Sequence, residues 1–398
     1  MSAPSITRFR RVRPEFQLTQ GFTLEWLAQA HTRAERTRHA RLGQEFDAAQ
    51  FADRISRHLQ RFGCGEDKIR YRYSAISDCE HTRFDEMQLY RVHENPSGAG
   101  MLERSRTYDR IALSALQKLY PEIDRESAPC DLVHVTCTGY AAPSAAQRWV
   151  SESGFGQLTR VTHAYHMGCY AALPALRIAS GLLSGRAENS SSKLPSRRPS
   201  AHIVHTELCT LHMNPLLHDP EQLVVQSLFG DGFIGYEVVG ASDLAAGEAG
   251  LQVLSVDEWI VPDSAQSMTW ICADNGMHMT LARDVPQRLS APLRAFVDHL
   301  LNEAGLDKSE RHRAILAIHP GGPRILDLVR DTLERDESAI AESRRVLAEN
   351  GNMSSATLPH IWMRLLEDPA VGEDRAIVTL AFGPGLTACG AVLRKHSA

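Results

Sequence analysis

Segments with strand-like and helix-like patterns alternate in both halves of this 398-residue chain, and this alternation restricts the fold more than any other feature. In the first half, an amphipathic helix pattern at 108–120 is followed by a strand pattern rich in β-branched residues at 131–138. In the second half, a strand pattern at 313–320 ends at Pro320, and a helix pattern begins at Pro323, since proline suits the first helical position. Alternation of this kind predicts a layered α/β architecture.

Four further segments fit this architecture. Apolar residues recur at helical spacing over residues 22–62, and a strand pattern occupies 201–208. Residues 375–394 have the pattern of two strands around a Gly-Pro-Gly turn, whereas the polar stretch 185–200 has no periodicity and is predicted to be an exposed loop. The length allows two domains or lobes with a large buried core.

Charge and hydropathy exclude several classes of partner. A net charge of −5 does not suit a protein that binds nucleic acid by bulk charge. The N-terminal stretch MSAPSITRFRRVRPEFQ is polar and basic and lacks the apolar core of a signal peptide. No apolar run approaches the roughly 18 residues that a membrane span needs. We therefore expect a cytoplasmic protein with neither a nucleic-acid partner nor a membrane span.

The cysteine pattern does not indicate a metal centre. The chain has eight cysteines, and none belongs to a CxxC pair, so the spacing does not favour zinc. In a chain without a secretion signal, free thiols are expected rather than disulfides. His163 and His166 lie close together in the sequence, but no further ligand motif accompanies them. We therefore predict no metal site.

The stretch GDGFIG, residues 230–235, satisfies the GxGxxG pattern of dinucleotide-binding proteins, but its context does not. That fingerprint follows a strand and opens a helix. Here a helix-like run, PEQLVVQSLF, precedes the glycines, and a strand-like run, FIGYEVVG, follows them. We interpret these glycines as turn residues.

One cysteine stands out as a candidate nucleophile. Cys169 follows a glycine at the head of a long apolar helix pattern, where a helix N-terminus would lower the pKa of its thiol. His319 ends a strand pattern and precedes PGGP, and Asn352 lies in a polar loop before a helix expected to be capped by Ser354 or Ser355. A cysteine, a histidine and an asparagine on loops suit nucleophilic catalysis. Spacing alone leaves open that Cys169 and His319 are core residues and that Asn352 is a turn residue.

Five motifs together resemble one enzyme family. They are HMGCYAALPALRIASGL, QSLFGDGFIGYEV, HPGGPRILDLV, GNMSSA and FGPGLT, and they occur in the order and rough spacing of the chalcone synthase-like enzymes, the type III polyketide synthases. The resemblance runs from about residue 50 to the C-terminus. It implies a thiolase-type αβαβα fold of two similar halves, at 1–250 and 251–398, and a homodimer.

The resemblance also implies which residues react. The family's nucleophilic cysteine falls on Cys169 in the first half, and its histidine and asparagine fall on His319 and Asn352 in the second. As a thiolate paired with imidazolium His319, Cys169 would hold an acyl-CoA starter as a thioester. His319 and Asn352 would donate hydrogen bonds to the thioester oxygen of malonyl-CoA as it loses carbon dioxide. Repeated extension would give a poly-β-keto chain that closes to a pyrone or a resorcinol-type ring.

Acyl-CoA and malonyl-CoA are thus the expected partners, and no metal or redox cofactor is needed. The phosphates of CoA need cations. Arg57 and Arg61 lie near the position of the family's basic CoA-binding helix. A solvated helix face explains these two arginines nearly as well.

The predicted cavity departs from the plant pattern. Phe229 matches a gating phenylalanine of the family, and Ser354 and Pro384 belong to two of the shared motifs. Where plant enzymes have a second gating phenylalanine, a small glycine and two threonines, this chain has Met279, Trp270, Cys137 and Cys209. Ala142 replaces a methionine that crosses the dimer interface in that family. These choices resemble bacterial members, and we hypothesise a fatty acyl starter, since a flexible methionine could open an apolar tunnel. Trp270 could equally fill that space.

Three other functions compete with this interpretation. An initiating ketoacyl synthase has the same three residues but performs a single condensation with a carrier-protein-linked extender. A papain-like hydrolase also uses cysteine, histidine and asparagine, but HMGCYAA does not match its CGSCW-like context. A non-catalytic thiolase-like binding protein would not need a thiolate at a helix end.

Overall fold

A nine-stranded mixed sheet forms the centre of the molecule, with strand order β11-β12-β13-β8-β1-β7-β6-β4-β5. The structure is a computed structural model that describes residues 3–188, 198–373 and 375–397. The strands of this sheet are β1 (Pro4–Val12), β4 (Asp131–Thr136), β5 (Arg160–Tyr165), β6 (Ala201–Glu207), β7 (Gly232–Gly240), β8 (Ala249–Ile260), β11 (Ile315–Ile318), β12 (Ala376–Gly383) and β13 (Thr387–Ser397).

Two small two-stranded sheets and a set of helices complete the described fold. The small sheets pair β2 (Phe16–Thr19) with β3 (Tyr71–Ser74) and β9 (Met268–Ala273) with β10 (Gly276–Leu281). The helices are α1 (Gln20–Arg41), α2 (Ala48–Phe62), α3 (Met101–Leu119), α4 (Ala145–Glu152), α5 (Ala172–Glu188), α6 (Pro220–Leu228), α7 (Val285–Glu303), α8 (Lys308–Arg313), α9 (Pro323–Thr332), α10 (Ala341–Asn350) and α11 (Thr357–Glu367).

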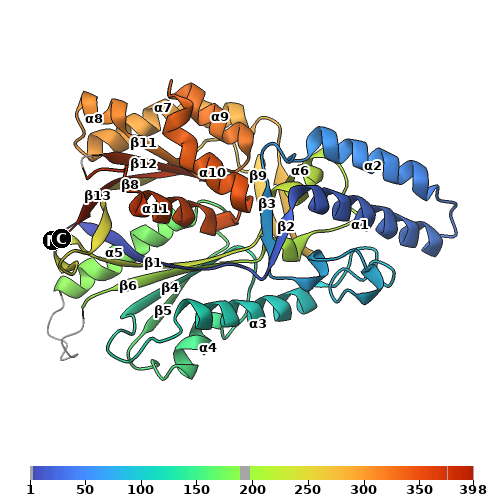
Figure 1. The fold of residues 1–398 in the computed structure, drawn as a ribbon, viewed down its shortest axis with the longest axis horizontal. Coiled ribbons are helices and arrows are strands. Elements are labelled where there is room, and N and C mark those ends of the chain that lie inside the picture. Colours follow the sequence, from blue (N-terminus) through green and yellow to red (C-terminus); the bar gives the residue numbers. More distant parts are fainter. Residues whose placement is uncertain (1–2, 189–197, 374, 398) are drawn as a thin grey trace.

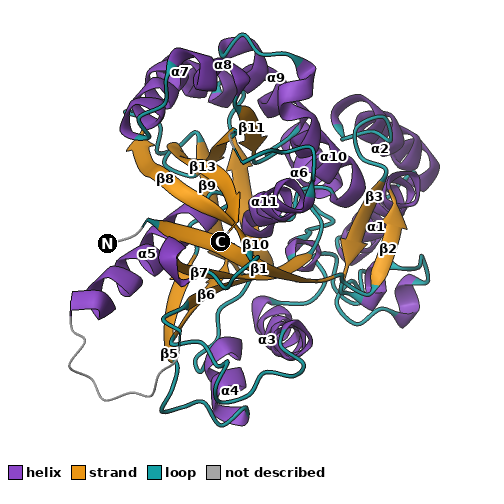
Figure 2. Cartoon of the chain, turned by 60° about the vertical axis from the view of Figure 1, so that its left-hand side comes forward, coloured by secondary structure: helices purple, strands orange, loops and turns teal. Residues whose placement is uncertain are grey.

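The elements are stacked in five layers (Figures 1 and 2). Helix α7 packs on β8 and β13 at one side, and α3 packs on β1, β6 and β7 at the other. Helices α5 and α11 lie between the two halves of the sheet, where α5 contacts β4, β6 and β7 and α11 contacts β8 and β11. The order helices, strands, helices, strands, helices confirms the expected αβαβα architecture.

Hydrophobic packing explains the layers. One buried cluster joins α3 and α4 to the inner strands and to α1 and α2, a second joins α5 and α11 to both halves of the sheet, and a third joins α7 and α9 to β11, β12 and β13. The middle helices bury apolar residues toward both halves of the sheet, and Leu173, Leu176 and Trp362 among them have no exposed surface. A helix that is apolar on most of its surface is stable only in such a buried layer.

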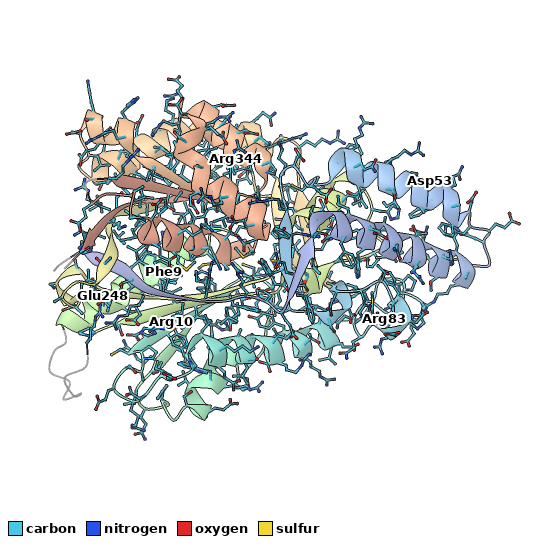
Figure 3. All side chains as sticks on the ribbon, viewed as in Figure 1. Phe9, Arg10, Asp53, Arg83, Glu248 and Arg344 are labelled. Carbon is cyan, nitrogen blue, oxygen red and sulfur yellow. The ribbon has the colours of Figure 1, made fainter. Side chains whose placement is uncertain are left out.

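Strand β1 joins the two halves of the sheet and separates two chemical environments. Phe9 and Arg10 point to opposite sides of this strand (Figure 3). The Phe9 ring lies 5.4 Å from the Tyr236 ring in the middle layer, whereas the Arg10 guanidinium lies over the Tyr120 ring on the side of α3. Alternation of this kind follows from the two-residue period of a strand.

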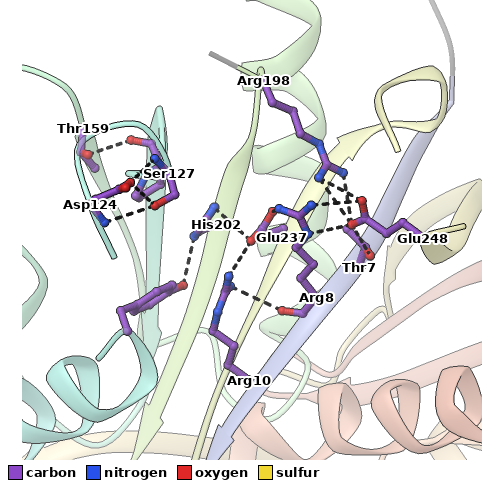
Figure 4. Close-up of polar contacts among 12 residues, drawn as sticks. Thr7, Arg8, Arg10, Asp124, Ser127, Thr159, Arg198, His202, Glu237 and Glu248 are labelled. Carbon is purple, nitrogen blue, oxygen red and sulfur yellow. Dashed lines mark hydrogen bonds and ion pairs between the residues drawn. The ribbon is translucent and has the colours of Figure 1, made fainter. Parts of the chain in front are cut away.

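A polar cluster fixes the register of β1 against its neighbours (Figure 4). Glu237 of β7 accepts a hydrogen bond from Arg10 at 2.8 Å, and Arg8 lies 3.5 Å from the same carboxylate. Glu248 accepts hydrogen bonds from Thr7 at 2.9 Å and from Arg198 at 3.1 Å. These contacts tie the first strand of the chain to segments that follow some 230 residues later.

Most of the predicted elements are confirmed with small shifts in their ends. The strand patterns at 131–138, 201–208 and 313–320 are β4, β6 and β11, and 375–394 contains β12 and β13. The glycines of GDGFIG lie between α6 and β7, as their context predicted.

The helical stretch 22–62 differs from prediction because it is broken into two helices. Helix α1 ends at Arg41, shortly before Gly43, which has a positive φ of 65°. Helix α2 begins after Asp47, whose side chain accepts a hydrogen bond from the Gln50 amide. Residues 185–188 of the predicted loop belong to α5, and residues 189–197 lie outside the described part of the chain.

Two other predictions remain open. The expected division at residue 250 falls inside β8, the strand that pairs with β1, and it stays a prediction. None of the described helices combines the length and apolar character that would let it cross a membrane. The cytoplasmic location stays a prediction.

Candidate active site

Cys169 lies in a tight turn between β5 and α5, three residues before the first residue of the helix. Gly168 has a positive φ of 86°, and a Cβ atom there would come within 2.7 Å of Pro384 Cδ. Glycine is therefore required before the cysteine both for its backbone conformation and for the close approach of the segment after β12. The predicted position of Cys169 at the head of an apolar helix is confirmed.

His319 reaches the same end of the sheet by strand pairing. It directly follows β11, and its backbone amide donates to the Leu380 carbonyl of β12 at 2.7 Å. Because β11 and β12 run parallel, their carboxyl ends lie together. Strand β12 continues from Leu380 to Gly383, and the next residue, Pro384, packs against Gly168. The pairing thus brings His319 to the edge that carries the cysteine turn.

Asn352 is fixed by its own backbone and by its side-chain oxygen. It forms an isolated parallel bridge with Phe229, and its Oδ1 accepts a hydrogen bond from the Ser354 amide at 2.8 Å. The Nδ2 atom is buried and has no partner within the described structure. The side chain therefore has its acceptor occupied and its donor available.

The predicted serine cap of the following helix is wrong. Ser354 has a positive φ of 49° in a short 3-10 turn, and α11 begins at Thr357 without a side-chain cap. Instead, Thr357 Oγ1 accepts a hydrogen bond from the Met353 amide at 2.8 Å, and Asn352 supplies the acceptor for Ser354. The Ser354 hydroxyl does not cap the helix and lies instead beside the Cys169 thiol.

Three buried nitrogen atoms at this edge have no hydrogen-bond partner in the described structure. They are Nδ1 and Nε2 of His319 and Nδ2 of Asn352. Such groups are rare in protein interiors because each one loses its hydrogen bonds to water. Unpartnered nitrogen atoms of this kind suit a site where negative charge develops on a substrate oxygen.

Burial acts against the charge on both groups of the expected thiolate–imidazolium pair, which stays a prediction. The Cys169 Sγ lies 3.9 Å from the Ser354 Oγ. Burial raises the pKa of Cys169 to about 12, although hydrogen bonding with Ser354 opposes this effect. Burial also lowers the pKa of His319 to about 3. Desolvation penalises both charges more than the helix N-terminus stabilises the thiolate.

Cys169 opens into a cavity of about 370 Å³. All seven residues that were predicted to line the substrate cavity line it, namely Cys137, Cys209, Phe229, Trp270, Met279, Ser354 and Pro384. These residues come from six separate stretches of sequence, and the fold brings them together around one cavity that also contains the Cys169 thiol.

Trp270 forms a fixed wall of this cavity. Its indole Nε1 donates a hydrogen bond to the Cys137 carbonyl at 2.6 Å. The His212 ring lies 6.1 Å from it at an interplanar angle of 87°. The amide of Gln222 holds the neighbouring strand by donating to the Met279 carbonyl at 2.7 Å. The expectation that Trp270 fills space in the cavity therefore agrees with its contacts.

Two buried polar residues beside the thiol were missed from the sequence. Glu207 accepts hydrogen bonds from the Cys137 amide at 3.0 Å, from Thr138 Oγ1 at 2.9 Å and from Ser355, while its burial raises its pKa. His212 donates to the Thr138 carbonyl at 2.7 Å and accepts from the Met277 amide at 3.1 Å. Both residues belong to TELCTLH, the segment that supplied Cys209, so their positions in that segment were the available signal.

The structure does not bring the two predicted CoA-binding arginines to the thiol cavity. Arg57 and Arg61 are exposed on α2. Arg57 lines a different cavity of about 550 Å³ beside Glu35 and His218, and the Arg61 guanidinium lies over the Phe62 ring at 5.1 Å. Their role toward CoA stays a prediction.

Comparison with known proteins gives concordant sequence matches. Residues 252–397 match the family model described as chalcone and stilbene synthases, C-terminal domain. The chain is 30% identical over 294 residues to the 1,3,6,8-tetrahydroxynaphthalene synthase of Streptomyces coelicolor, a match that covers 73% of this chain and 74% of that protein. It is 28% identical over 237 residues to type III polyketide synthase A of Arabidopsis thaliana, covering 58% and 57% of the two chains.

Solved structures share the fold over the whole chain. The crystal structure of PKS-I from the brown alga Ectocarpus siliculosus aligns with a TM-score of 0.80 at 20% identity and covers 100% of this chain and 99% of that one. The tetrahydroxynaphthalene synthase of Streptomyces coelicolor aligns with a TM-score of 0.72 at 24% identity, covering 99% and 100%. These structural similarities concern the fold alone.

Proposed function

The chain belongs to the chalcone synthase-like type III polyketide synthases, and we propose from the geometry at Cys169 how its residues carry out the reaction. Enzymes of this class extend an acyl-CoA starter by repeated decarboxylative condensation with malonyl-CoA, and this chain is an acyltransferase of that class. The observations that carry the residue assignment are the Cys169 thiol in the cavity lining and the unpartnered buried nitrogen atoms of His319 and Asn352.

Starter loading begins with proton transfer from the Cys169 thiol to His319. Because burial disfavours the charge on each group, the charged pair forms when a substrate carbonyl is in place to accept the sulfur. The thiolate adds to the carbonyl carbon of the acyl-CoA, and the bond to the CoA sulfur breaks. The departing CoA sulfur takes the proton from His319, which leaves an acyl thioester on Cys169.

Chain extension uses the same donors for a different oxygen. The bond between the malonyl carboxylate and its α-carbon breaks, carbon dioxide leaves, and the electron pair passes into an enolate. Asn352 Nδ2 and His319 donate hydrogen bonds to the enolate oxygen. The enolate carbon then attacks the Cys169 thioester, so that a carbon–carbon bond forms and the cysteine sulfur leaves. Transfer of the lengthened chain back to Cys169 permits another round.

The cavity favours an aliphatic starter. Most of its lining is apolar, and the Met279 side chain occupies the position of a bulkier gate. Burial of methylene groups in such a cavity supplies binding free energy of about 0.8 kcal/mol each. We infer a fatty acyl starter and closure of the product to a pyrone or a resorcinol-type ring. The thiol, imidazole and amide supply every proton and hydrogen bond of these steps, and we propose that no metal or redox cofactor takes part.

The second proposal concerns a homodimer. Strand β5 lies at the end of the sheet order. The backbone amides of Arg160 and His166 donate to the carbonyls of Cys130 and Thr136 on the β4 side. Because successive amides of a strand point to opposite sides, the amide of Val161 points to the open edge. An open edge of this kind is a template for pairing with a second chain.

Sedimentation analysis should give the mass of two chains for the wild-type protein, and Val161→Pro should shift that mass toward one chain. A wild-type protein that sediments as one chain at every concentration contradicts the homodimer.

The reaction is tested with purified protein, malonyl-CoA and a panel of short, long and aromatic acyl-CoA starters. Mass spectrometry should detect products with two or more malonyl-derived units, and Cys169→Ala should abolish them. A product with a single added unit, formed only from carrier-protein-linked malonate, would support an initiating ketoacyl synthase instead. Absence of any extended product from the wild-type protein contradicts the assignment of these residues.

A further inference from the structure

The cavity at Cys169 has two ends with different surroundings. One end lies at the tip of the β9–β10 hairpin, where Ala273 and Asp274 are exposed. The other end is formed by β2 and the first turns of α1, where the lining residues Leu18, Trp26 and Leu27 are 6%, 3% and 1% exposed. Figure 1 shows α1 and α6 on the side of the molecule away from β5. The residues that form the bottom of the α1 end are therefore shielded from water.

We propose that the α1 end is the subsite for the aliphatic tail of the starter and that Trp26 is the floor that limits its length. The proposal rests on the acyl-CoA condensation described above and adds a position for the tail. The tail would run from the Cys169 thioester past Cys209 and along Met213, Leu217 and Val225 to the indole.

The indole of Trp26 cannot swing aside to admit a longer chain. Its Nε1 donates to the carbonyls of Asp78 at 3.0 Å and His81 at 2.9 Å. The ring also packs edge-on against Tyr90 at a centroid distance of 5.4 Å. The Asp78 carboxylate in turn accepts hydrogen bonds from the amides of Leu89 and Tyr90, so the acceptor segment is itself held. A ring with two backbone acceptors and packed faces is a rigid boundary.

Several polar groups around the α1 end already have protein partners, whereas Gln226 Oε1 and Arg72 Nε have none in the described structure. Thr23 Oγ1 donates to the Thr19 carbonyl at 3.0 Å, and Gln226 Nε2 donates to the Leu217 carbonyl at 2.8 Å. The buried cation of the lining, Arg72, donates through Nη1 to the Gln226 carbonyl at 2.8 Å. An alkyl chain placed there removes apolar surface from water without displacing these hydrogen bonds.

The hairpin end is a poorer place for the tail. Trp270 belongs to β9 of this hairpin, and its indole Nε1 donates a hydrogen bond to the Cys137 carbonyl at 2.6 Å. Beyond it the lining residues Ala273 and Asp274 are exposed, so methylene groups there would stay in contact with water. Only the buried end supplies the roughly fourfold gain in affinity that each buried methylene group brings.

The test measures kcat/KM for straight-chain acyl-CoA starters from acetyl to palmitoyl with malonyl-CoA. Trp26→Ala removes the floor and should improve the use of longer starters. The measure is kcat/KM for the shortest starter that the wild type rejects, divided by kcat/KM for its preferred starter. This ratio should rise at least tenfold in Trp26→Ala. Val225→Phe narrows the subsite, and the optimum should move to shorter chains. Ala273→Phe adds the same ring at the hairpin end and should leave the length profile within twofold of wild type.

The outcomes separate the two proposals. Suppose that several starters are extended and that the length profile changes in Ala273→Phe but in neither Trp26→Ala nor Val225→Phe. This result overturns the α1 subsite and leaves the condensation intact. Failure of the wild-type protein to extend any starter overturns the condensation itself. If Trp26→Ala does not fold, as judged by circular dichroism, Val225→Phe decides alone, because its loss of long-chain preference is required and an unchanged profile contradicts the subsite.

Discussion

Phe229 and Asn352 lie opposite each other across an isolated parallel bridge at the edge of the active-site cavity. The Asn352 amide donates to the Leu228 carbonyl at 3.0 Å, and the Gly230 amide donates to the Asn352 carbonyl at 2.9 Å. The residue that lines the cavity and the residue that offers a hydrogen-bond donor are thus parts of one rigid unit. Rigid placement of donors before the reaction is the main source of electrostatic catalysis.

Asn352→Asp should separate chain extension from starter loading. Aspartate keeps the acceptor for the Ser354 amide but replaces the free Nδ2 donor with a negative oxygen. Loss of one oxyanion donor lowers a rate by about a hundredfold to a thousandfold, so release of carbon dioxide from malonyl-CoA should fall by at least that factor. Loading of Cys169 by the starter should stay within about tenfold. Equal losses in the two steps would contradict the assigned role.

Alkylation of Cys169 in the substrate-free enzyme should depend steeply on pH. Burial raises the pKa of this thiol to about 12, so its thiolate fraction grows about tenfold for each pH unit below that value. The rate with iodoacetamide, followed on the Cys169 peptide, should rise about a hundredfold between pH 7 and pH 9. His319→Gln should preserve this slope, since the imidazole is neutral there. A rate that is already constant above about pH 7 would indicate a standing thiolate.

Trp270→Gly should change the number of extension steps. The indole fills one side of the cavity and is held by the Cys137 carbonyl, so its removal opens room for a longer poly-β-keto chain. Mass spectrometry should show a shift to products with at least one further malonyl-derived unit. The matched control is Trp259→Gly, since Trp259 packs on Phe296 and is not part of the cavity lining. Identical product distributions for Trp270→Gly and the wild type would contradict a limiting role for Trp270.

The positions of the candidate reactive residues could be predicted from the motifs because local structure determines those positions. Gly168, the Cys169 turn and the strand end at His319 depend on neighbours in sequence, so their positions could be inferred without knowledge of the packing. The same holds for α6, the glycines of GDGFIG and β7, where order along the chain excluded a nucleotide site.

Other features depended on contacts that no short motif records. The α1 residue Trp26 reaches the cavity only through the packing of distant segments, and the side chain of Asn352 replaces the expected serine cap. The burial of Cys169, which raises the pKa of its thiol against the effect expected of the helix N-terminus, is not visible in the sequence. Burial is a property of the folded layers.

His212 should make the protein less stable at acidic pH. Burial lowers its pKa from 6.5 to about 3, so between these values the unfolded chain binds a proton that the folded chain does not. Its contribution to the free energy of unfolding is therefore complete above about pH 6.5 and falls by about 1.4 kcal/mol per pH unit as the pH decreases toward 3. The protonated ring would also lose the acceptor for the Met277 amide.

Urea unfolding at several pH values tests this contribution. The slope of the unfolding free energy against pH should be smaller by about 1.4 kcal/mol per unit in His212→Gln than in the wild type. Other buried histidines, such as His134 and His205, are present in both proteins and cancel in the comparison. The control His312→Gln, on the exposed surface of α8, should match the wild-type slope. Parallel curves for His212→Gln and the wild type would contradict the prediction.

The most direct test of the account is the site of the acyl group. The enzyme is incubated with an acyl-CoA starter in the absence of malonyl-CoA, and peptide mass spectrometry locates the added mass. The account predicts one acyl group per chain on Cys169, lost in Cys169→Ala and retained in Asn352→Asp. An acyl group on Cys137 or Cys209, or no acyl group while extended products still form, would contradict the central claim that Cys169 holds the growing chain.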